Sequence, residues 1–413
     1  MREKKREKYD VVIIGGGASG LTAAIYCGRA QLNTLLIEKS LIGGLATYTN
    51  EIENFPGFPE GSSGLGLMEL FHKQAKKFGT KFKLTDVKSV KLEGEVKEVE
   101  TFRNIFECRT IIIASGGRPR ITRAQNEEKF LFDKGISFCA TCDAAANTDK
   151  TVMVIGSGDA AIEEGTFLSK FAKKIIVSVI HDTGKMDCNE IAKDQAMSNP
   201  KMEFAWNTMV SSFEGEDHLK KVMLKNLKTG ELEPYEVDTC FEFIGYVPNT
   251  EIFKDTDLQM SKQGYIVTNE NMETGIPGVF ACGDVREKDL KQVATAVGDG
   301  AVAGVGAEHY IAESIMFEEQ IMQKEKVGLI YVYSAIDAPS RELLPDMQEV
   351  TDAFREKVKL NVIDLYKGKR LCDRLACDVE PMTVFYTKNG EVVEISNDCA
   401  KTQVSAKLAE LVK

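Results

Sequence analysis

Hydrophobic and polar positions near the N-terminus follow the order strand, turn, helix, strand. Tyr9–Ile14 is a short β-branched run, typical of a buried parallel strand. Leu21–Arg29 has a helical pattern, and Thr34–Ile37 is a second apolar run that ends in Glu38. The basic segment Met1–Lys8 precedes an apolar run that is short and ends in glycines, so it predicts a solvated tail and not a signal peptide. The pattern indicates a βαβ unit of an α/β fold.

The turn between this strand and helix has the glycine spacing of a dinucleotide-binding site. Gly15 permits the tight turn, Gly17 lets the backbone approach a pyrophosphate, and Gly20 lets the helix pack close to the strand. The amides and dipole of the helix N-terminus favour phosphate groups. Glu38, at the end of the next strand, suits the hydroxyls of an adenosine ribose. We therefore expect a bound nucleotide here.

The same pattern recurs in the middle of the chain. Thr151–Ile155 and Lys174–Ile180 are predicted strands, and Gly156 and Gly158 open the helix between them, with Ala161 at the third small position. The spacing again suits a dinucleotide. A Rossmann half that packs but binds nothing remains the alternative.

After a charged connector at 318–326, the C-terminal region has its own order of predicted elements. Pro381 precedes the third strand, and a turn at Lys388–Glu391 predicts a hairpin. The connector could be a helix or a solvated linker. The predicted strands and helices are strand Val327–Tyr333, helix Arg341–Lys357, strand Lys359–Asp364, a further helix, strand Met382–Thr387, another strand, and an amphipathic helix Lys401–Val412.

Composition narrows the class of protein. A chain of 413 residues is long enough for two or three domains, and 43% hydrophobic with 28% charged residues is typical of a globular protein. A net charge of −11 argues against a nucleic-acid partner. No apolar run approaches the roughly 18 residues that suggest a membrane span. With no export signal, we expect a cytoplasmic protein.

Between the two glycine fingerprints lies a C-x-x-C pair, Cys139 and Cys142. In a reducing cytosol such a pair is more often redox-active or metal-binding than a structural disulfide. Zinc is disfavoured, because the chain has only four histidines and no second C-x-x-C. Two nucleotide sites and a dithiol in this order indicate an electron path from nucleotide to nucleotide to disulfide.

Over Tyr9–Ala312 the chain resembles the low-molecular-weight thioredoxin reductases, flavoproteins with an FAD domain and an NADPH domain that carries the C-x-x-C. The motifs that carry the resemblance, beyond the two fingerprints, are Gly43-Gly44-Leu45, Glu53-Asn54-Phe55-Pro56-Gly57, Ala114-Ser115-Gly116, Cys139-Ala140-Thr141-Cys142-Asp143, Gly245-Tyr246-Val247-Pro248-Asn249-Thr250, Gly278-Val279-Phe280-Ala281-Cys282-Gly283-Asp284 and Lys291-Gln292-Val293.

The resemblance implies roles for these residues. Cys142 is the sulfur beside the flavin, Cys139 attacks the substrate disulfide, and Asp143 supplies or accepts the proton. A helix N-cap is the simpler interpretation of Asp143, and it could be both. The residues implied to bind FAD are Gly15, Gly17, Ala18, Ser19, Gly20, Glu38, Lys39, Gly43, Gly44, Leu45, Asn54, Val87, Ala114, Ser115, Gly116, Gly283, Asp284, Lys291, Gln292 and Val293. For the pyridine nucleotide, the second fingerprint predicts Gly156, Gly158, Asp159 and Ala160, and the acid after the following strand predicts Asp182.

The resemblance also implies a discontinuous domain organisation and a homodimer. The FAD domain comprises residues 1–116 and 245–317, and the pyridine-nucleotide domain is inserted at 117–244. The family rotates one domain against the other, and the glycines at 116–117 and 245 suit crossing linkers. A linker at 318–326 and a separate domain at 327–413 follow.

The second fingerprint departs from the NADPH-using pattern. Those members carry H-R-R-x-x-x-R after the second strand of this unit, and its arginines hold the 2′-phosphate. Here His181 is followed by Asp182 and Thr183, and Asp187 takes the place of the last arginine. NADPH is therefore disfavoured, because an acid at the end of this strand suits a ribose 2′-hydroxyl. NADH, with Asp182 on the ribose, is favoured because the glycine fingerprint is retained. Reduction by ferredoxin or another protein remains the alternative. Leu45 is a smaller departure, because the family usually has glutamine there.

The C-terminal region resembles a thioredoxin domain whose active site is missing. The position of W-C-G-P-C holds Ile336-Asp337-Ala338-Pro339-Ser340, and Pro381 matches the cis-proline of that family. A docking, shielding or dimer-stabilising role is expected. Cys372, Cys377 and Cys399 are expected to be free buried cysteines, and a substitute redox pair among them remains the alternative.

The sequence thus predicts two Rossmann-like three-layer domains plus a thioredoxin-like α/β domain. The expected activity is transfer of electrons from NADH through FAD and a dithiol to a thioredoxin-type protein disulfide. One alternative is a ferredoxin-fed reductase, and another is a flavin-bearing assembly subunit with little turnover.

Overall fold

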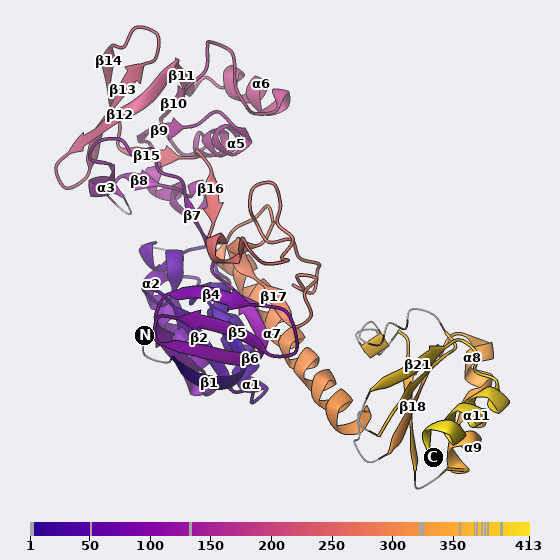
Figure 1. Ribbon diagram of the computed structural model, residues 1–413. Helices are drawn as coiled ribbons and strands as arrows, with labels where there is room; N and C mark the ends of the chain where they lie inside the picture. Colours follow the sequence, from indigo (N-terminus) through magenta and orange to yellow (C-terminus); the bar gives the residue numbers. More distant parts are fainter. Residues whose placement is uncertain are drawn as a thin grey trace. The chain divides into compact units, whose positions relative to one another are not determined.

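The computed structural model describes residues 4–49, 52–131, 134–321, 326–354, 357–366, 368, 371–372, 375, 377, 380–388 and 391–413. The chain forms two compact units, Met1–Glu308 and His309–Lys413 (Figure 1). Each has its own buried core. Within the described residues, no helix has both the length and the apolar character required to cross a membrane.

A seven-stranded sheet, here called the first sheet, organises the N-terminal part of the first unit. Its strand order is β3-β2-β1-β6-β5-β4, and β17 pairs with β6. β1, β2, β3, β6 and β17 pair in parallel, whereas β4 and β5 are antiparallel. The strands are β1 (Lys5–Ile14), β2 (Thr34–Glu38), β3 (Lys81–Leu84), β4 (Val87–Lys91), β5 (Lys97–Thr101), β6 (Asn104–Ile113) and β17 (Val279–Ala281).

The parallel strands are apolar on both faces because helices cover them. Val11–Ile13 and Ile111–Ile113 are fully buried. β17 joins the first sheet although it lies far along the chain from β6, its partner. The first sheet is therefore built from two segments of sequence, one before and one after the strands of the second sheet described below. The helices of this part are α1 (Ala18–Arg29), η1 (Gly44–Tyr48), α2 (Gly64–Lys77), η3 (Glu251–Phe253), η4 (Gly283–Val285) and α7 (Val293–Met316).

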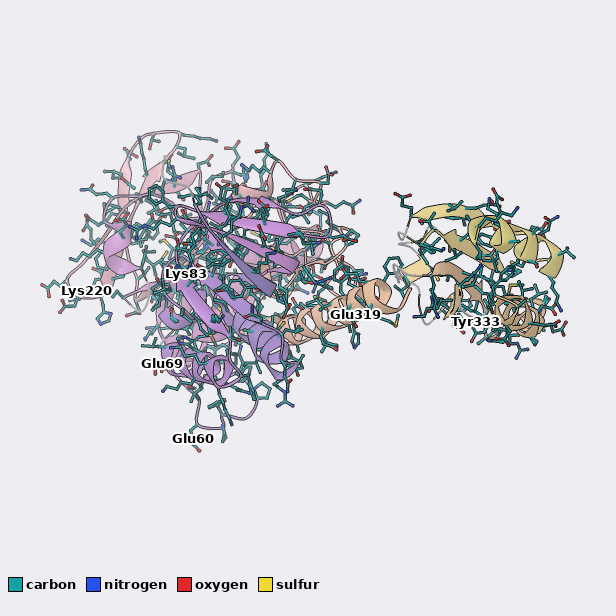
Figure 2. All side chains as sticks on the ribbon, turned by 60° about the horizontal axis from the view of Figure 1, so that its bottom comes forward. Glu60, Glu69, Lys83, Lys220, Glu319 and Tyr333 are labelled. Atoms are coloured by element: carbon teal, nitrogen blue, oxygen red, sulfur yellow. A yellow bond between two sulfur atoms is a disulfide. The ribbon has the colours of Figure 1, made fainter. Side chains whose placement is uncertain are left out.

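Glycines bring α7 against α1. A Cβ at Gly300 would lie 2.2 Å from the carbonyl oxygen of Ser19, and one at Gly304 would lie 2.7 Å from Cβ of Tyr26. Larger residues would force the two helices apart. Charged side chains such as Glu69 on α2 and Lys83 on β3 are exposed instead (Figure 2).

The predicted solvated tail is wrong from Lys5 onward. Residues 5–8 extend β1 and pair with the start of β6. Arg6 explains the extension, because its Nη1 lies 3.0 Å from Glu98 and 2.5 Å from Glu107. The basic residues face carboxylates on neighbouring strands and not only water.

The second sheet has five parallel strands in the order β11-β10-β9-β15-β8. A ribbon in which β7 pairs with β16 carries the chain between the two sheets (Figure 1). An antiparallel sheet, β12-β13-β14, accompanies it. The elements are β7 (Gly117–Pro119), α3 (Glu127–Phe130), β8 (Ile136–Ser137), α4 (Ala140–Asp143), η2 (Ala145–Asn147), β9 (Thr151–Ile155), α5 (Asp159–Leu168), β10 (Lys174–Val179), α6 (Glu190–Ser198), β11 (Met202–Trp206), β12 (Thr208–Gly215), β13 (Leu219–Asn226), β14 (Leu232–Glu236), β15 (Thr239–Glu242) and β16 (Tyr246–Pro248).

The second unit is a four-stranded sheet in the order β19-β18-β20-β21. β18 is parallel to β19 and antiparallel to β20, and β20 is antiparallel to β21. The elements are η5 (Phe317–Ile321), β18 (Val327–Tyr333), α8 (Ala338–Glu342), α9 (Leu344–Asp352), β19 (Val358–Asp364), β20 (Met382–Tyr386), β21 (Val392–Ser396) and α11 (Lys401–Leu411).

The α/β class, the Rossmann-type sheets and the strands predicted in both halves are confirmed. The single helix predicted at 341–357 is wrong: it is two helices, and the second carries Pro345 in its first turn. Proline is accepted there because it lacks the N–H that a helix interior needs. The centre of the predicted turn at 388–391, and residues 322–325 of the connector, lie outside the described residues.

Candidate active site

The glycine turn between β1 and α1 leaves no room for a side chain at two of its glycines. Gly15 has a φ of +109°, and a Cβ there would lie 2.2 Å from the carbonyl oxygen of Ala114. A Cβ at Gly20 would lie 2.0 Å from the carbonyl oxygen of Gly15. Around Gly17, the N-cap of α1, the Cβ position is open. Ala18–Ser19 then begin the helix as buried residues. The space beside Gly17 is where a bound pyrophosphate would approach the backbone of the turn.

Glu38 lies beside this turn, as predicted for a ribose-binding acid. Its Oε2 accepts a hydrogen bond of 2.8 Å from the backbone N–H of Gly16, and its Oε1 accepts one of 2.9 Å from that of Ser40. The N–H of Gly43 donates to the carbonyl of Gly16 at 2.7 Å, which places the 43–44 segment against the turn. Lys39 is exposed.

Asp284 brings a buried carboxylate oxygen that accepts no hydrogen bond to the same region. Its Oδ1 is buried without a hydrogen-bond partner, and burial raises the pKa of the carboxyl. Lys288 Nζ lies 3.9 Å from that oxygen, too far for a hydrogen bond. Buried acceptors of this kind usually have a donor, so the site suits a bound hydroxyl.

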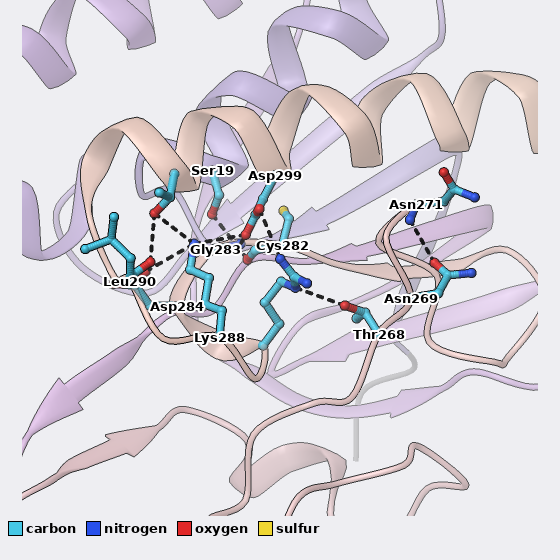
Figure 3. A network of polar contacts seen from close by, with 12 residues as sticks. Ser19, Thr268, Asn269, Asn271, Cys282, Gly283, Asp284, Lys288, Leu290 and Asp299 are labelled. Atoms are coloured by element: carbon cyan, nitrogen blue, oxygen red, sulfur yellow. Dashed lines mark hydrogen bonds and ion pairs between the residues drawn. The ribbon is translucent and has the colours of Figure 1, made fainter. Parts of the chain in front are cut away.

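Asp299 organises the segment around Asp284 (Figure 3). One carboxylate oxygen accepts from the N–H of Gly283 and from Lys288 Nζ, both at 3.0 Å. The other accepts from Arg286 Nη1 at 3.1 Å. A Cβ at Gly283 would lie 2.4 Å from Ser19 Oγ, so the segment packs directly on the start of α1.

Further residues predicted to bind FAD lie outside the first glycine turn. Ser115 and Asn249 exchange two hydrogen bonds of 2.8 Å, beside Gly116, whose φ is +62° and whose Cβ position is open. Leu45 is 40% exposed in η1, whereas Val87 is buried in the core of the first sheet. Val87 can therefore offer a ligand its backbone more readily than its side chain.

A small cavity of about 50 Å³ borders the disulfide. Asn54 Nδ2 donates to Gln292 Oε1 at 3.1 Å across one side of it. Lys291 Nζ donates to the carbonyl of Lys288 at 2.8 Å and lies 4.6 Å from the ring centre of Tyr265. The residues that line the cavity are Thr49, Ile52, Glu53, Asn54, Thr141, Cys142, Gln292 and Val293.

Cys139 and Cys142, the predicted redox pair, form a disulfide at the start of α4. Cys139 is the N-cap of this short helix, and Cys142 is the member that lines the cavity. Asp143 follows directly, and its Oδ2 accepts from Ser137 Oγ at 2.5 Å. Ser137 Oγ in turn accepts from the N–H of Cys139 at 3.2 Å. Burial raises the pKa of Asp143, and the hydrogen bond from Ser137 opposes that shift.

The second glycine turn has the same construction as the first. Gly156 has a φ of +133°, and a Cβ there would lie 2.6 Å from the carbonyl oxygen of Phe243. Gly158, the N-cap of α5, has an open Cβ position, and Ala160 after it is exposed. Asp159 Oδ1 accepts from the backbone N–H of Asn189 at 2.7 Å.

Two of the acids after β10 have different surroundings. Asp182 forms an ion pair with Lys228, which lowers its carboxyl pKa. Asp187 lies at the glycine turn, where its Oδ2 accepts from Ser157 Oγ at 2.8 Å and contacts His181 Nε2 at 2.7 Å. These hydrogen bonds lower the pKa of Asp187. Asp187 is therefore the acid placed beside the second fingerprint.

Comparison with known proteins agrees with this geometry. The family model for pyridine nucleotide-disulphide oxidoreductases matches residues 9–300. The chain belongs to this family. It is 38% identical over 317 residues to "Thioredoxin reductase" of Peptoclostridium acidaminophilum, covering 75% of this chain and 99% of the relative. It is 39% identical over 306 residues to that of Bacillus subtilis, covering 74% and 95%.

A solved structure gives the same result. The thioredoxin reductase from Streptococcus pyogenes MGAS5005 matches with a TM-score of 0.70 and 38% identity, over 74% of this chain and 98% of that one. The protein is thus a flavoprotein disulfide reductase of the thioredoxin reductase type, and the family supports FAD as its cofactor.

The residues of this reductase fit FAD. The open backbone at Gly17, the acid Glu38 and the buried Oδ1 of Asp284 offer contacts for the pyrophosphate, the ribose and a ribityl hydroxyl. Sequence reasoning missed Asp299 and Ser137. Ser137, two residues before the C-x-x-C, had a local signal in its polar side chain, whereas Asp299 had none because its partners come from another segment.

In the second unit of the reductase, the 334–340 loop is held by structural hydrogen bonds. Asp337 Oδ2 caps α8 by accepting from the N–H of Ser340 at 2.7 Å. Ser340 is fully buried, and its Oγ accepts from the N–H of Ser334 at 3.1 Å. Cys372, Cys377 and Cys399 are buried, as predicted. The Glu380–Pro381 peptide bond is cis.

Proposed function

We propose that this protein transfers electrons from NADH through FAD to Cys139–Cys142 and then to the disulfide of a thioredoxin-type protein. One observation carries the proposal: Cys142 lines the same cavity as Asn54, Gln292 and Val293, the residues expected beside the flavin ring. When bound, FAD accepts a hydride and supplies two electrons to the disulfide.

In this proposal, side chains around the disulfide have separate roles in thiol exchange and proton transfer. Cys142 lines the cavity, which supports it as the sulfur beside the flavin and leaves Cys139 as the sulfur proposed to attack a partner disulfide. Asp143, held by Ser137, is one turn of helix away from Cys139 and can exchange a proton as the disulfide opens. Its raised pKa keeps more of the acid form near neutral pH than an exposed aspartate has.

NADH as the donor is supported by the charges at the second fingerprint. Asp187 is the acid at the glycine turn, so it is a better candidate for a ribose hydroxyl than Asp182, which pairs with Lys228. Both carboxylates would repel a 2′-phosphate. Both carboxylates are exposed and solvent screens their repulsion, so we expect a preference for NADH of about tenfold.

The second candidate is a reductase fed by ferredoxin or another redox protein. Its support is that Ser157 and His181 both contact Oδ2 of Asp187, so this carboxylate also has a structural role at the glycine turn. In this alternative the second glycine turn serves only the packing of α5.

Anaerobic stopped-flow spectroscopy with NADH, NADPH and reduced ferredoxin separates these donors. We expect flavin bleaching by NADH at least about ten times faster than by NADPH. Asp182→Arg with Asp187→Arg should narrow or reverse the preference. The matched control is Gly158→Val, which should keep the FAD spectrum and abolish reduction by either nucleotide. Equal rates with both nucleotides would contradict the charge argument, and reduction by ferredoxin alone would establish the second candidate.

For the second unit we propose a thioredoxin-like domain that acts by contact. Its strand order, with β18 parallel to β19 and antiparallel to β20, supports this assignment. Asp337 and Ser340 stand where thiols would be needed, and each is committed to a hydrogen bond. Serine at Cys372, Cys377 and Cys399 should leave turnover intact, and collapse of turnover with folding preserved would show an electron relay instead.

The domain organisation belongs to the same proposal. The FAD domain would comprise residues 1–116 and 245–317, and the inserted domain residues 117–244. The ribbon of β7 and β16 supports these boundaries, because it contains both crossing segments. A homodimer in the cytoplasm remains the expectation from the family resemblance, and analytical ultracentrifugation would measure the oligomeric state.

A further inference from the structure

A chain of hydrogen bonds leads from Asn54 through Gln292 and Thr141 to the sulfur of Cys139. Asn54 Nδ2 lies 3.1 Å from Gln292 Oε1, and Gln292 Nε2 lies 3.2 Å from Thr141 Oγ1. Thr141 Oγ1 lies 3.4 Å from Cys139 Sγ. The Gln292–Thr141 contact joins residues 151 positions apart in the sequence.

The direction of this chain follows from the chemistry at its sulfur end. A disulfide sulfur carries no proton, so Thr141 must donate its hydroxyl hydrogen to Cys139 Sγ. The hydroxyl oxygen of Thr141 then accepts from the amide of Gln292, which turns the Gln292 carbonyl toward the amide of Asn54. Every donor in the chain therefore points toward Cys139.

Two further N–H groups point at the same sulfur. The backbone N–H of Cys142 donates to Cys139 Sγ at 3.2 Å, and Gln292 Nε2 lies 3.9 Å from it. No comparable hydrogen bond from a described residue to Cys142 Sγ accompanies them. The surroundings therefore favour negative charge on Cys139 over Cys142.

We infer that Thr141 and Gln292 are positioning residues that stabilise Cys139 as the thiolate when the disulfide is reduced. Reduction breaks the S–S bond with two electrons and one proton, leaving one thiolate and one thiol. Hydrogen bonds to a charged acceptor are stronger than those to a neutral one, so the hydrogen bonds to Cys139 Sγ strengthen as the thiolate forms. The inference rests on the proposed role of Cys139 as the sulfur that meets the partner.

The pKa of Cys139 tests the inference without any electron donor or partner protein. In the FAD-loaded Cys142→Ser protein, Cys139 cannot form the disulfide, and the eight other cysteines are buried. The rate of alkylation of Cys139 by iodoacetamide, followed by mass spectrometry across pH, gives its pKa.

Thr141→Val in this background should raise the Cys139 pKa by about one unit, because it removes one hydrogen bond to a partly exposed anion. Thr141→Ser keeps the hydroxyl and is the matched control, so its pKa should stay near that of the parent. Gln292→Leu should raise the pKa in the same direction, and it carries the test if Thr141→Val does not fold.

Equal Cys139 pKa values in the valine and serine variants would overturn the inference, as would an unchanged value in Gln292→Leu. A reductase that NADH fails to reduce would refute the proposed donor but leave this measurement intact. Conversely, an unshifted pKa with normal NADH turnover would refute only the hydrogen-bond chain.

Discussion

Removing the hydroxyl of Ser137 should change the pH dependence of disulfide reduction through Asp143. Ser137 Oγ donates to Asp143 Oδ2 at 2.5 Å, and this bond lowers a carboxyl pKa that burial otherwise raises. Ser137→Ala removes the opposing effect, so the pKa of Asp143 should rise further. The alkaline limit of a step that needs protonated Asp143 should then move to higher pH.

The magnitude follows from the strength of the lost bond. A hydrogen bond to a charged group is worth about 1.5–3 kcal/mol, and one pKa unit corresponds to 1.36 kcal/mol. Asp143 is only partly buried, so water replaces some of the lost stabilisation. We therefore expect a rise of about one pKa unit, or a tenfold larger acid fraction on the alkaline limb.

The assay is a single turnover that does not depend on the physiological donor. Enzyme reduced with a stoichiometric amount of dithionite is mixed anaerobically with a small aromatic disulfide, and the release of its thiolate is followed at each pH. Ser137→Thr keeps the hydroxyl and is the control. An alkaline limb that stays in place, or moves to lower pH, in Ser137→Ala would refute the assigned hydrogen bond or the role of Asp143.

Three further predictions test the fold around the sites. Gly20→Ala should destabilise the protein by about 1–3 kcal/mol in denaturant titrations, because the added Cβ would meet the backbone of Gly15. Gly17→Ala should keep the fold and weaken FAD binding in fluorescence titrations. Equal unfolding free energies for the two variants would contradict the packing argument. Burial raises the pKa of the Glu242 carboxyl from 4.5 to about 9. The free energy of unfolding should therefore fall as pH rises from about 5 to 9. Glu242→Gln should reduce this dependence on pH in unfolding titrations over the same range. An unchanged slope would mean that Glu242 is not buried in solution. Asp337→Ala should lower the free energy of unfolding by about 1 kcal/mol, because α8 loses the hydrogen bond from the Ser340 N–H to its N-cap. The reduction of disulfides by Cys139 and Cys142 should be unaltered. A loss of turnover in the folded variant would contradict a purely structural role for Asp337.

Local patterns were enough for the elements that depend on short stretches of sequence. Glycine spacing predicted both turns, because a Cβ at Gly15 or Gly156 would clash with the backbone of a neighbouring strand. Apolar runs predicted the parallel strands because both faces of those strands are covered. The acid Glu38 was predicted from its position at the end of β2, directly after the apolar residues of that strand.

Ion pairing and hydrogen bonding across strands corrected other predictions. The sequence alone treats Arg6 as part of a solvated tail, but carboxylates on β5 and β6 draw its segment into β1. The local pattern favours Asp182 over Asp187 as the acid for a ribose, because Asp182 lies closer to the end of the predicted strand. Lys228, from a distant turn, pairs with Asp182, whereas Asp187 accepts a hydrogen bond from Ser157 in the second glycine turn.

The sequence by itself determined the α/β class, the two glycine turns and the dithiol with its adjacent acid, because each depends on neighbours within a few residues. The tertiary structure decided which distant side chain joins Thr141 and Cys142 beside the sulfur of Cys139. Gln292 meets Thr141 across 151 residues of chain, and no local pattern records such a contact. Hydrogen bonds act over about 3 Å, so the chemistry of this sulfur depends on how the two sheets bring distant segments together.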